Sequence, residues 1–178
     1  HARALKSCLH NWHRVDFLIN SAGGALKVAP IEEMDDEINQ KIMDLNLTSA
    51  VMSCRTFTPQ FKKQKFGKIL NVSSACDRRS WPGWSIYSAA KAAVNAFTRC
   101  LYTELRPHGI CVGLVVPGGS NTGFQNAATG VEDFEWDEAL AVRPEHFADM
   151  VYQTCALTMG GCVTEVVVYG LAQDVSGY

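Results

Sequence analysis

The sequence has 178 residues, of which 47% are hydrophobic and 19% charged, and these values are typical of one globular domain with an ordinary core. The net charge of −2 and the pI near 6.2 exclude the strongly basic surface of nucleic-acid-binding domains. No apolar run reaches the roughly 18 residues of a membrane span, so we expect neither nucleic acid nor membrane as a partner.

The first predicted elements are an amphipathic helix over residues 1–12 and a short apolar strand over residues 15–20, from the spacing of their apolar positions. The small residues Ser21 to Gly24 follow the strand. Small side chains after a strand allow a ligand to approach the backbone closely, although such a turn taken alone is more often a plain loop.

Residues 31 to about 63 have helical periodicity, with acidic residues crowding the start as the helix dipole favours. Asn46 lies in the middle of this predicted helix. A lone helical Asn is usually an ordinary polar position, so the residue has no assigned role on this ground alone.

Residues 68–105 read as strand, loop and helix. Tyr87 and Lys91 are four residues apart, so a helix places them one turn apart on the same face. A nearby cation favours the tyrosinate and lowers the pKa of the phenol from about 10, which would suit proton transfer in both directions. Ser74 lies thirteen residues before Tyr87, at a strand end where ligands of parallel α/β sheets bind.

This arrangement resembles the short-chain dehydrogenase/reductase family, in which a catalytic Tyr-x-x-x-Lys follows a catalytic Ser by thirteen residues. The resemblance implies catalytic roles for Ser74, Tyr87 and Lys91. It also implies that Asn46, in Asp44-Leu-Asn-Leu-Thr48, holds a water that relays protons to the lysine.

Cofactor contacts are implied by the same resemblance. The turn after the first strand is similar to the family's Asn-Asn-Ala-Gly motif, with Ser21 as a departure in the second position. Pro117-Gly118 and Thr122, after a predicted buried strand over residues 110–116, are similar to the segment that lies against the nicotinamide. The implied cofactor residues are Asn20, Ser21, Ala22, Gly23, Tyr87, Lys91, Pro117, Gly118 and Thr122.

Two segments are candidate substrate walls. The loop over residues 75–86 contains Arg78, Arg79, Trp81 and Trp84; it is either an ordinary surface loop or an apolar wall whose arginine meets an anionic substrate group. The acidic segment over residues 118–142 is either a solvated loop or a lid over the substrate. A last helix beginning at Pro144 and a last strand over residues 163–169 complete the pattern.

Seven cysteines occur at positions 8, 54, 76, 100, 111, 155 and 162, without any Cys-x-x-Cys pair. An odd number without framework spacing indicates reduced, buried thiols and a cytoplasmic protein. His10 and His13 have no third ligand at a suitable spacing, so no metal site is predicted.

No glycine pattern in the sequence matches the phosphate-binding loop of the family, although there are fourteen glycines. Compared with the family, about two βα units are missing before residue 1. We expect an α/β, Rossmann-like parallel sheet with helices on both faces, lacking the first βα units, as one partial NAD(P)-binding domain over residues 1–178. NADP is favoured over NAD, although the residue that meets the ribose lies in the missing part.

The predicted function is an NAD(P)-dependent oxidoreductase that interconverts an alcohol and a carbonyl, with a ketone, aldehyde or 3-oxo/3-hydroxy acyl substrate. The resemblance also implies a homodimer or homotetramer, formed through the helices around residues 34–63 and 85–106. The alternative is a cofactor-less fragment that acts as a non-catalytic interaction module. The sequence upstream of residue 1 would discriminate between them, since an in-frame phosphate-binding loop there supports the enzyme.

Overall fold

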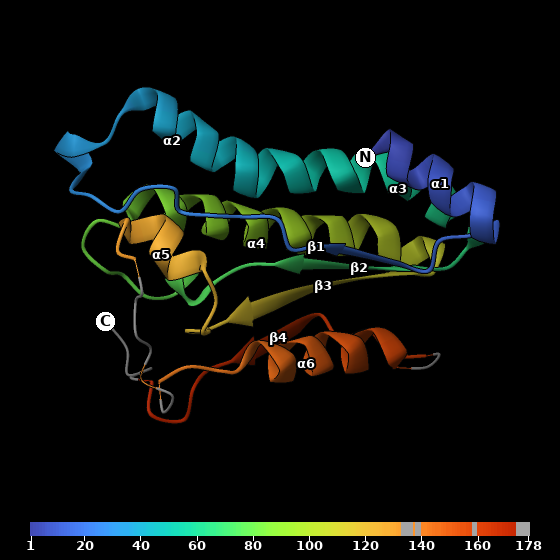
Figure 1. Cartoon of the computed structure of the whole chain (residues 1–178). Helices are drawn as coiled ribbons and strands as arrows, with labels where there is room; N and C mark the ends of the chain where they lie inside the picture. The colour runs from blue at the N-terminus through green and yellow to red at the C-terminus, as the bar shows by residue number, and fades with distance from the viewer. Residues whose placement is uncertain (133–136, 138–139, 158–159, 174–178) are drawn as a thin grey trace.

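The structure, a computed structural model, describes residues 1–132, 137, 140–157 and 160–173. Its centre is a sheet of four parallel strands in the order β1-β2-β3-β4 (Figure 1). The strands are β1 Phe17–Asn20, β2 Gly67–Val72, β3 Ile110–Pro117 and β4 Glu165–Val168. Each crossover between parallel strands contains helices, so the predicted Rossmann-like α/β class is confirmed.

Helices cover both faces of the sheet (Figure 1). On one face lie α1 Ala2–Trp12, α2 Asp36–Met43, α3 Ser49–Gln64 and α4 Ser85–Leu105, and on the other lies α6 Pro144–Ala156. The short helix α5 Phe124–Thr129 lies beyond the carboxyl ends of the strands. That end of the sheet is where ligands bind in open parallel α/β folds.

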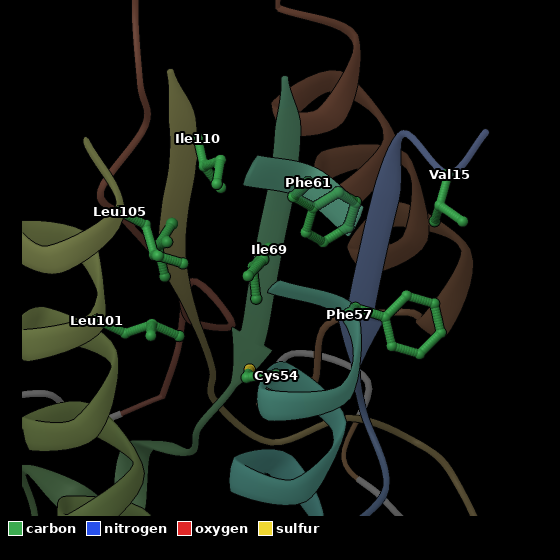
Figure 2. Close-up of a cluster of buried hydrophobic side chains, with 9 residues drawn as sticks. Val15, Cys54, Phe57, Phe61, Ile69, Leu101, Leu105 and Ile110 are labelled. Carbon is green, nitrogen blue, oxygen red and sulfur yellow. The ribbon is translucent and has the colours of Figure 1, made fainter. Parts of the chain in front are cut away.

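The largest core cluster fills the space between the sheet and the helices α3 and α4 (Figure 2). Phe57 and Phe61 of α3 and Leu101 and Leu105 of α4 pack there against Ile69 of β2. A second cluster joins Leu70 and Val115 to Cys155 of α6 on the opposite face. Burial on both faces explains why β3 is a nearly continuous apolar run.

The predicted helix over residues 31–63 is a 3-10 turn, Ile31–Glu33, followed after two extended residues by three consecutive helical pieces. Asp35 accepts hydrogen bonds from the backbone N–H groups of Glu37 and Ile38, so it caps α2 and fixes its start at residue 36. A π-helical turn, Asp44–Thr48, then separates α2 from α3. Such turns are rare and frequently occur at functional sites.

The interpretation of all seven cysteines as reduced, buried thiols is wrong. Cys111 and Cys162 form a disulfide with a Cα–Cα distance of 5.4 Å, and Cys100 is exposed. Because Leu114 pairs with Glu165 in the β3–β4 register, continuing that register three residues back places Cys111 opposite Cys162. The pairing was hidden from the sequence by the 51 residues that separate the two cysteines.

The strand β1 forms one edge of the described sheet, with β2 as its partner. Its Phe17 and Ile19 side chains are 45% and 46% exposed, which is unusual for a short apolar strand and leaves an edge open to pairing. Among the helices that the structure describes, none is both long and apolar enough to cross a lipid bilayer.

Candidate active site

A cavity of about 730 Å³ opens at the carboxyl ends of the strands. It is lined by the turn after β1, the loop after β2, the first turns of α4, the segment after β3, and residues of α5, α6 and the C-terminal segment. Ser74, Tyr87 and Lys91 all contribute to its wall. The three residues thus converge on one cavity, from the end of β2 and from one face of α4.

Ser74 and Tyr87 are positioned by short-range structure. The Ser74 hydroxyl accepts a hydrogen bond from the Cys76 N–H at 3.2 Å, which caps the 3-10 turn Ala75–Asp77. Tyr87 lies in the first turn of α4, and a side-chain hydrogen bond joins it to Ser74. The two hydroxyl groups are therefore adjacent, as a pair that shares one substrate oxygen must be.

The Lys91 ammonium donates a hydrogen bond of 3.0 Å to the Val72 carbonyl at the end of β2. Its Nζ lies 5.6 Å from the centroid of the Tyr87 ring. Burial lowers the pKa of Lys91 to about 8, while the neighbouring Cys76 and Asp77 oppose that fall. The ammonium is thus held at the floor of the cavity with its charge only partly compensated.

The predicted lowering of the Tyr87 pKa is not what the structure has. Burial raises the pKa of the phenol, and the hydrogen bond with Ser74 opposes the rise. Desolvation disfavours the tyrosinate, and the Lys91 ammonium is directed to the Val72 carbonyl. The phenol is accordingly protonated at neutral pH.

Asn46 lies in the π-helical turn, buried behind the cavity. Its side chain donates to the carbonyls of Gly24 and Ile42, both at 2.8 Å, and accepts from the Gly24 N–H at 3.1 Å. A Cβ on Gly23 would lie 2.6 Å from the Asn46 oxygen and 3.0 Å from the Lys91 Nζ. A larger residue at position 23 would therefore force Asn46 or Lys91 to move, while the water relay assigned to Asn46 stays a prediction.

The implied cofactor residues are only partly gathered. Ser21, Gly23, Pro117, Gly118 and Thr122 line the cavity together with Tyr87 and Lys91. Ala22 does not line it, and Asn20 instead donates a hydrogen bond of 2.8 Å to its neighbour on β2, Asn71.

The site fits the nicotinamide end of NAD(P). Ser21 and Gly23 line the cavity together with Lys91, so the ammonium is a donor that could hold a ribose hydroxyl of the cofactor. Nothing among the fourteen glycines forms the phosphate-binding pattern. In the described part of the chain no group of three or more His, Cys, Asp or Glu could hold a metal ion.

Aromatic rings form one side of the cavity. The Trp84 ring lies 5.8 Å from that of Tyr87 and 6.2 Å from that of Phe124, and Tyr87 and Phe124 are 5.5 Å apart. Trp81 and Arg79 also line the cavity. These contacts support the apolar-wall interpretation of the loop over residues 75–86.

Arg78 is placed differently from its neighbour. Its guanidinium pairs with Asp77 at 3.3 Å and with Glu165 of β4, and it does not line the cavity. Of the two arginines considered for an anionic substrate group, Arg79 is the one at the cavity.

Several lining residues were not expected from the sequence. Gln173 reaches the cavity from the C-terminal segment, and its side-chain oxygen accepts a hydrogen bond of 3.1 Å from the Gly119 N–H. Phe124 of α5 and Phe147 of α6 also contribute. The candidate lid over residues 118–142 is described only in part: its acidic residues Asp133, Glu135 and Glu138 lie outside the described residues.

The sequence profile of the short chain dehydrogenase family matches residues 1–132. A 3-oxoacyl-[acyl-carrier-protein] reductase of Synechocystis is 36% identical over 114 residues, which cover 64% of this chain and 46% of the relative. Dehydrogenase/reductase SDR family member 7B of Xenopus laevis is 32% identical over 180 residues, covering 98% of this chain and 54% of the relative. The chain thus spans about half the length of the curated relatives it matches.

The fold agrees with these sequence matches. The closed form of a serine dehydrogenase in complex with NADP⁺ superimposes with a TM-score of 0.90 at 24% identity, covering 100% of this chain and 75% of that chain. With a parallel sheet, a Ser74–Tyr87–Lys91 cavity at its carboxyl edge and a family profile matched over residues 1–132, the chain belongs to the short-chain dehydrogenase/reductase family.

Proposed function

We propose that this protein is an NAD(P)-dependent oxidoreductase that interconverts an alcohol and a carbonyl compound. The observation that carries the proposal is the convergence of Ser74, Tyr87 and Lys91 on one cavity. A bound nicotinamide supplies or takes up the hydride, which is the cofactor's own chemistry. The chain's residues then have to bind the substrate oxygen, orient it and move one proton.

In the reducing direction, the substrate oxygen accepts hydrogen bonds from the hydroxyls of Ser74 and Tyr87. Tyr87 then gives its proton to the oxygen as negative charge develops there. Lys91 stabilises the tyrosinate that remains, because its ammonium lies 5.6 Å from the ring centroid. Asn46, separated from Lys91 only by Gly23, holds the water that returns a proton to this pair.

Carbonyl reduction is the direction that the site favours. Burial raises the pKa of Tyr87, so the phenol is in the protonated form that reduction uses. Oxidation requires the tyrosinate, which is scarce at neutral pH and becomes available only as the pH rises.

The substrate carries an apolar group beside its carbonyl. Trp84 and Phe124 stack at 6.2 Å next to Tyr87, and an aromatic wall of this kind favours flat apolar groups. A ketone, an aldehyde or a 3-oxoacyl compound meets this requirement, and the last agrees with the name of the Synechocystis relative. NADP is favoured over NAD because the serine dehydrogenase with the same fold is a complex with NADP⁺.

The test is the loss of NADPH or NADH absorbance by the 178-residue chain with ring ketones, linear ketones and 3-oxoacyl esters. Turnover is expected with at least one class and should disappear in Tyr87→Phe. Reduced nicotinamide mononucleotide is a second probe, since it needs only the nicotinamide end of the site. If the chain binds neither NADPH nor this mononucleotide, the proposal is overturned.

The alternative is a non-catalytic interaction module. It is favoured by the exposed Phe17 and Ile19 on β1. An isolated chain that binds no cofactor but associates with a full-length relative would support the module. An isolated chain that turns over NADPH would exclude it.

We also propose that the chain forms a homodimer or homotetramer through the helices over residues 34–63 and 85–106, which contain α2, α3 and α4. The small side chains of Ala89, Ala92 and Ala96 are exposed along α4 and would permit close helix packing. Light scattering during gel filtration gives the oligomer mass directly. A cytoplasmic location is the remaining proposal, and the Cys111–Cys162 disulfide argues against it because disulfides are rare there.

A further inference from the structure

Asp77 is a buried carboxylate directly behind the candidate active site. It ends the 3-10 turn that Ser74 caps, and its side chain has 0% exposure. Burial of a charge is costly unless nearby groups compensate it. The mechanism above does not use this residue, so its position needs a physical account.

The contacts of Asp77 connect it to a residue next to Ser74 and to a residue one helical turn from Lys91. Its Oδ2 accepts a hydrogen bond of 3.2 Å from the Ser73 hydroxyl and another from the Asn95 amide. Ser73 precedes Ser74, and its hydroxyl lies 3.3 Å from the backbone oxygen of Lys91. Asn95 follows Lys91 by one turn on α4. The carboxylate is therefore anchored on the same helical turn that carries the ammonium.

The second carboxylate oxygen is only partly compensated. Asp77 Oδ1 lies 3.3 Å from Arg78 Nε, yet within the described residues it has no hydrogen bond of acceptable geometry. Arg78 is shared with Glu165 of β4. A residual negative charge is thus left next to the cavity, where the titratable neighbours are Cys76, Tyr87 and Lys91.

We propose that Asp77 is a positioning residue that keeps Lys91 charged, so that the ammonium can support proton transfer by Tyr87 at and above neutral pH. This role rests on the proposed function of the site. The electrostatic direction follows from the position of the buried carboxylate, which Ser73 and Asn95 anchor against the turn of α4 that carries Lys91, since a buried negative charge favours the protonated form of a nearby amine. It opposes the burial that lowers the pKa of Lys91.

If Asp77 had only a structural role, it would hold the 3-10 turn in place without affecting the protonation state of Lys91. The substitution Asp77→Asn separates the two roles, because the amide is nearly isosteric and has no charge. Reduction needs both Lys91 and Tyr87 in the protonated form, so both groups act on the alkaline limb of the pH–rate profile. Removal of the charge lowers the pKa of both, and this limb should move to lower pH by about 0.5 to 1 pH unit. A purely structural role would lower the rate and leave the alkaline limb in place.

Two variants complete the comparison. Asp77→Glu retains the charge and should restore the wild-type alkaline limb. Ser73→Ala removes one hydrogen bond of the cluster while Asp77 remains charged, and should also leave that limb where it is. An unmoved alkaline limb in a folded Asp77→Asn protein would overturn the proposal.

A measurement without turnover separates this proposal from the proposed function. NMR titration of the Lys91 side chain, with lysine labelled at the ε carbon, should give a lower pKa in Asp77→Asn than in the wild type. In the wild type, the Asp77 carboxyl carbon should show an inflection at the pH where Lys91 titrates, so the test survives a variant that does not fold. If the Asp77 carboxyl shift does not change at the pH where Lys91 titrates, the proposed role of Asp77 is wrong. If both NMR effects are seen but the chain has no turnover, only the proposed oxidoreductase function is wrong.

Discussion

The two sides of the cavity are built differently. On one side, β2 and α4 hold the polar groups through buried hydrogen bonds, including Lys91 to Val72 at 3.0 Å and Asn71 to Thr98 at 2.9 Å. On the other, the segment after β3 is joined by partly buried contacts, such as Ser120 to the Val142 carbonyl at 2.8 Å, and Leu140 at the cavity is 39% exposed. The groups that transfer the proton are thus held rigidly by the β2–α4 side, while the groups that contact the substrate lie on the less tightly packed segment after β3.

This difference teaches that chemistry and substrate choice should be separable by mutation. Changes on the β2–α4 side should alter the rate of proton transfer with little change in which substrate is preferred. Changes after β3 should alter substrate preference with little change in the pH dependence. Four variants test the two sides of the cavity, two by activity and two by stability.

The largest expected effect is that of Tyr87→Phe. Loss of the hydroxyl removes the proton donor while the ring contacts with Trp84 and Phe124 remain. The kcat should fall by about 10²–10⁴, the range of general acid–base catalysis. Stopped-flow measurement of NADPH consumption gives the rate, and fluorescence titration should show unchanged cofactor affinity. Turnover equal to the wild type would remove Tyr87 from the mechanism.

The second variant tests how much the Cys111–Cys162 disulfide stabilises the part of the fold after β3. The double substitution Cys111→Ala/Cys162→Ala releases the 51-residue link between β3 and the segment before β4, and should lower the free energy of unfolding by about 2–4 kcal/mol. Urea unfolding followed by circular dichroism measures the loss. Cys100→Ala, at an exposed free cysteine, is the matched control. If the double variant is as stable as this control, the bond does not contribute in solution.

Lys91→Met should stabilise the fold at pH 7 by a net of about 1–2 kcal/mol while turnover is lost. The pKa of Lys91 is lowered on folding from 10.5 to about 8. At about 1.4 kcal/mol per pH unit, this is a penalty of about 3 kcal/mol, offset in the variant by the lost hydrogen bond to Val72.

The pH dependence of stability gives the sign of the Lys91 effect. The penalty is fully present below pH 8, where both the folded and unfolded chains bind the proton. Between pH 8 and 10.5 only the unfolded chain binds it, so wild-type stability contains a contribution that rises with pH. Urea unfolding at a series of pH values should show this contribution in the wild type and not in Lys91→Met. Identical pH profiles would contradict the burial of a charged lysine.

Phe124→Ala should have the smallest effect, and only on substrate binding. It removes one ring that packs against Trp84 and Tyr87, at a loss of about 1 kcal/mol. The KM for a ring ketone should rise about fivefold relative to a linear ketone, with little change in kcat. Tyr152→Ala, at an aromatic residue 66% exposed on α6, is the control. A changed pH profile in Phe124→Ala would break the separation between the two sides.

The accuracy of the sequence interpretation follows the same division. The 3.6-residue period of α4 was enough to place Tyr87 and Lys91 on one face, and the apolar run of β3 was enough to predict a strand buried on both faces. The start of α2 was missed because the acidic residues before it are also compatible with helix, and only the hydrogen bonds of Asp35 decide where it begins.

The sequence by itself determined the parallel α/β layers and the spacing of Ser74, Tyr87 and Lys91, because these depend on local periodicity and on the order of the elements. Only the tertiary structure decided the Cys111–Cys162 pair, the approach of Gln173 to Gly119 and the enclosure of Asp77 behind Lys91. The upward direction of the pKa shift of Tyr87 belongs with the second group. Each of these features depends on which distant segments of the chain pack together and exclude water, and the spacing of residues along the sequence does not specify that packing.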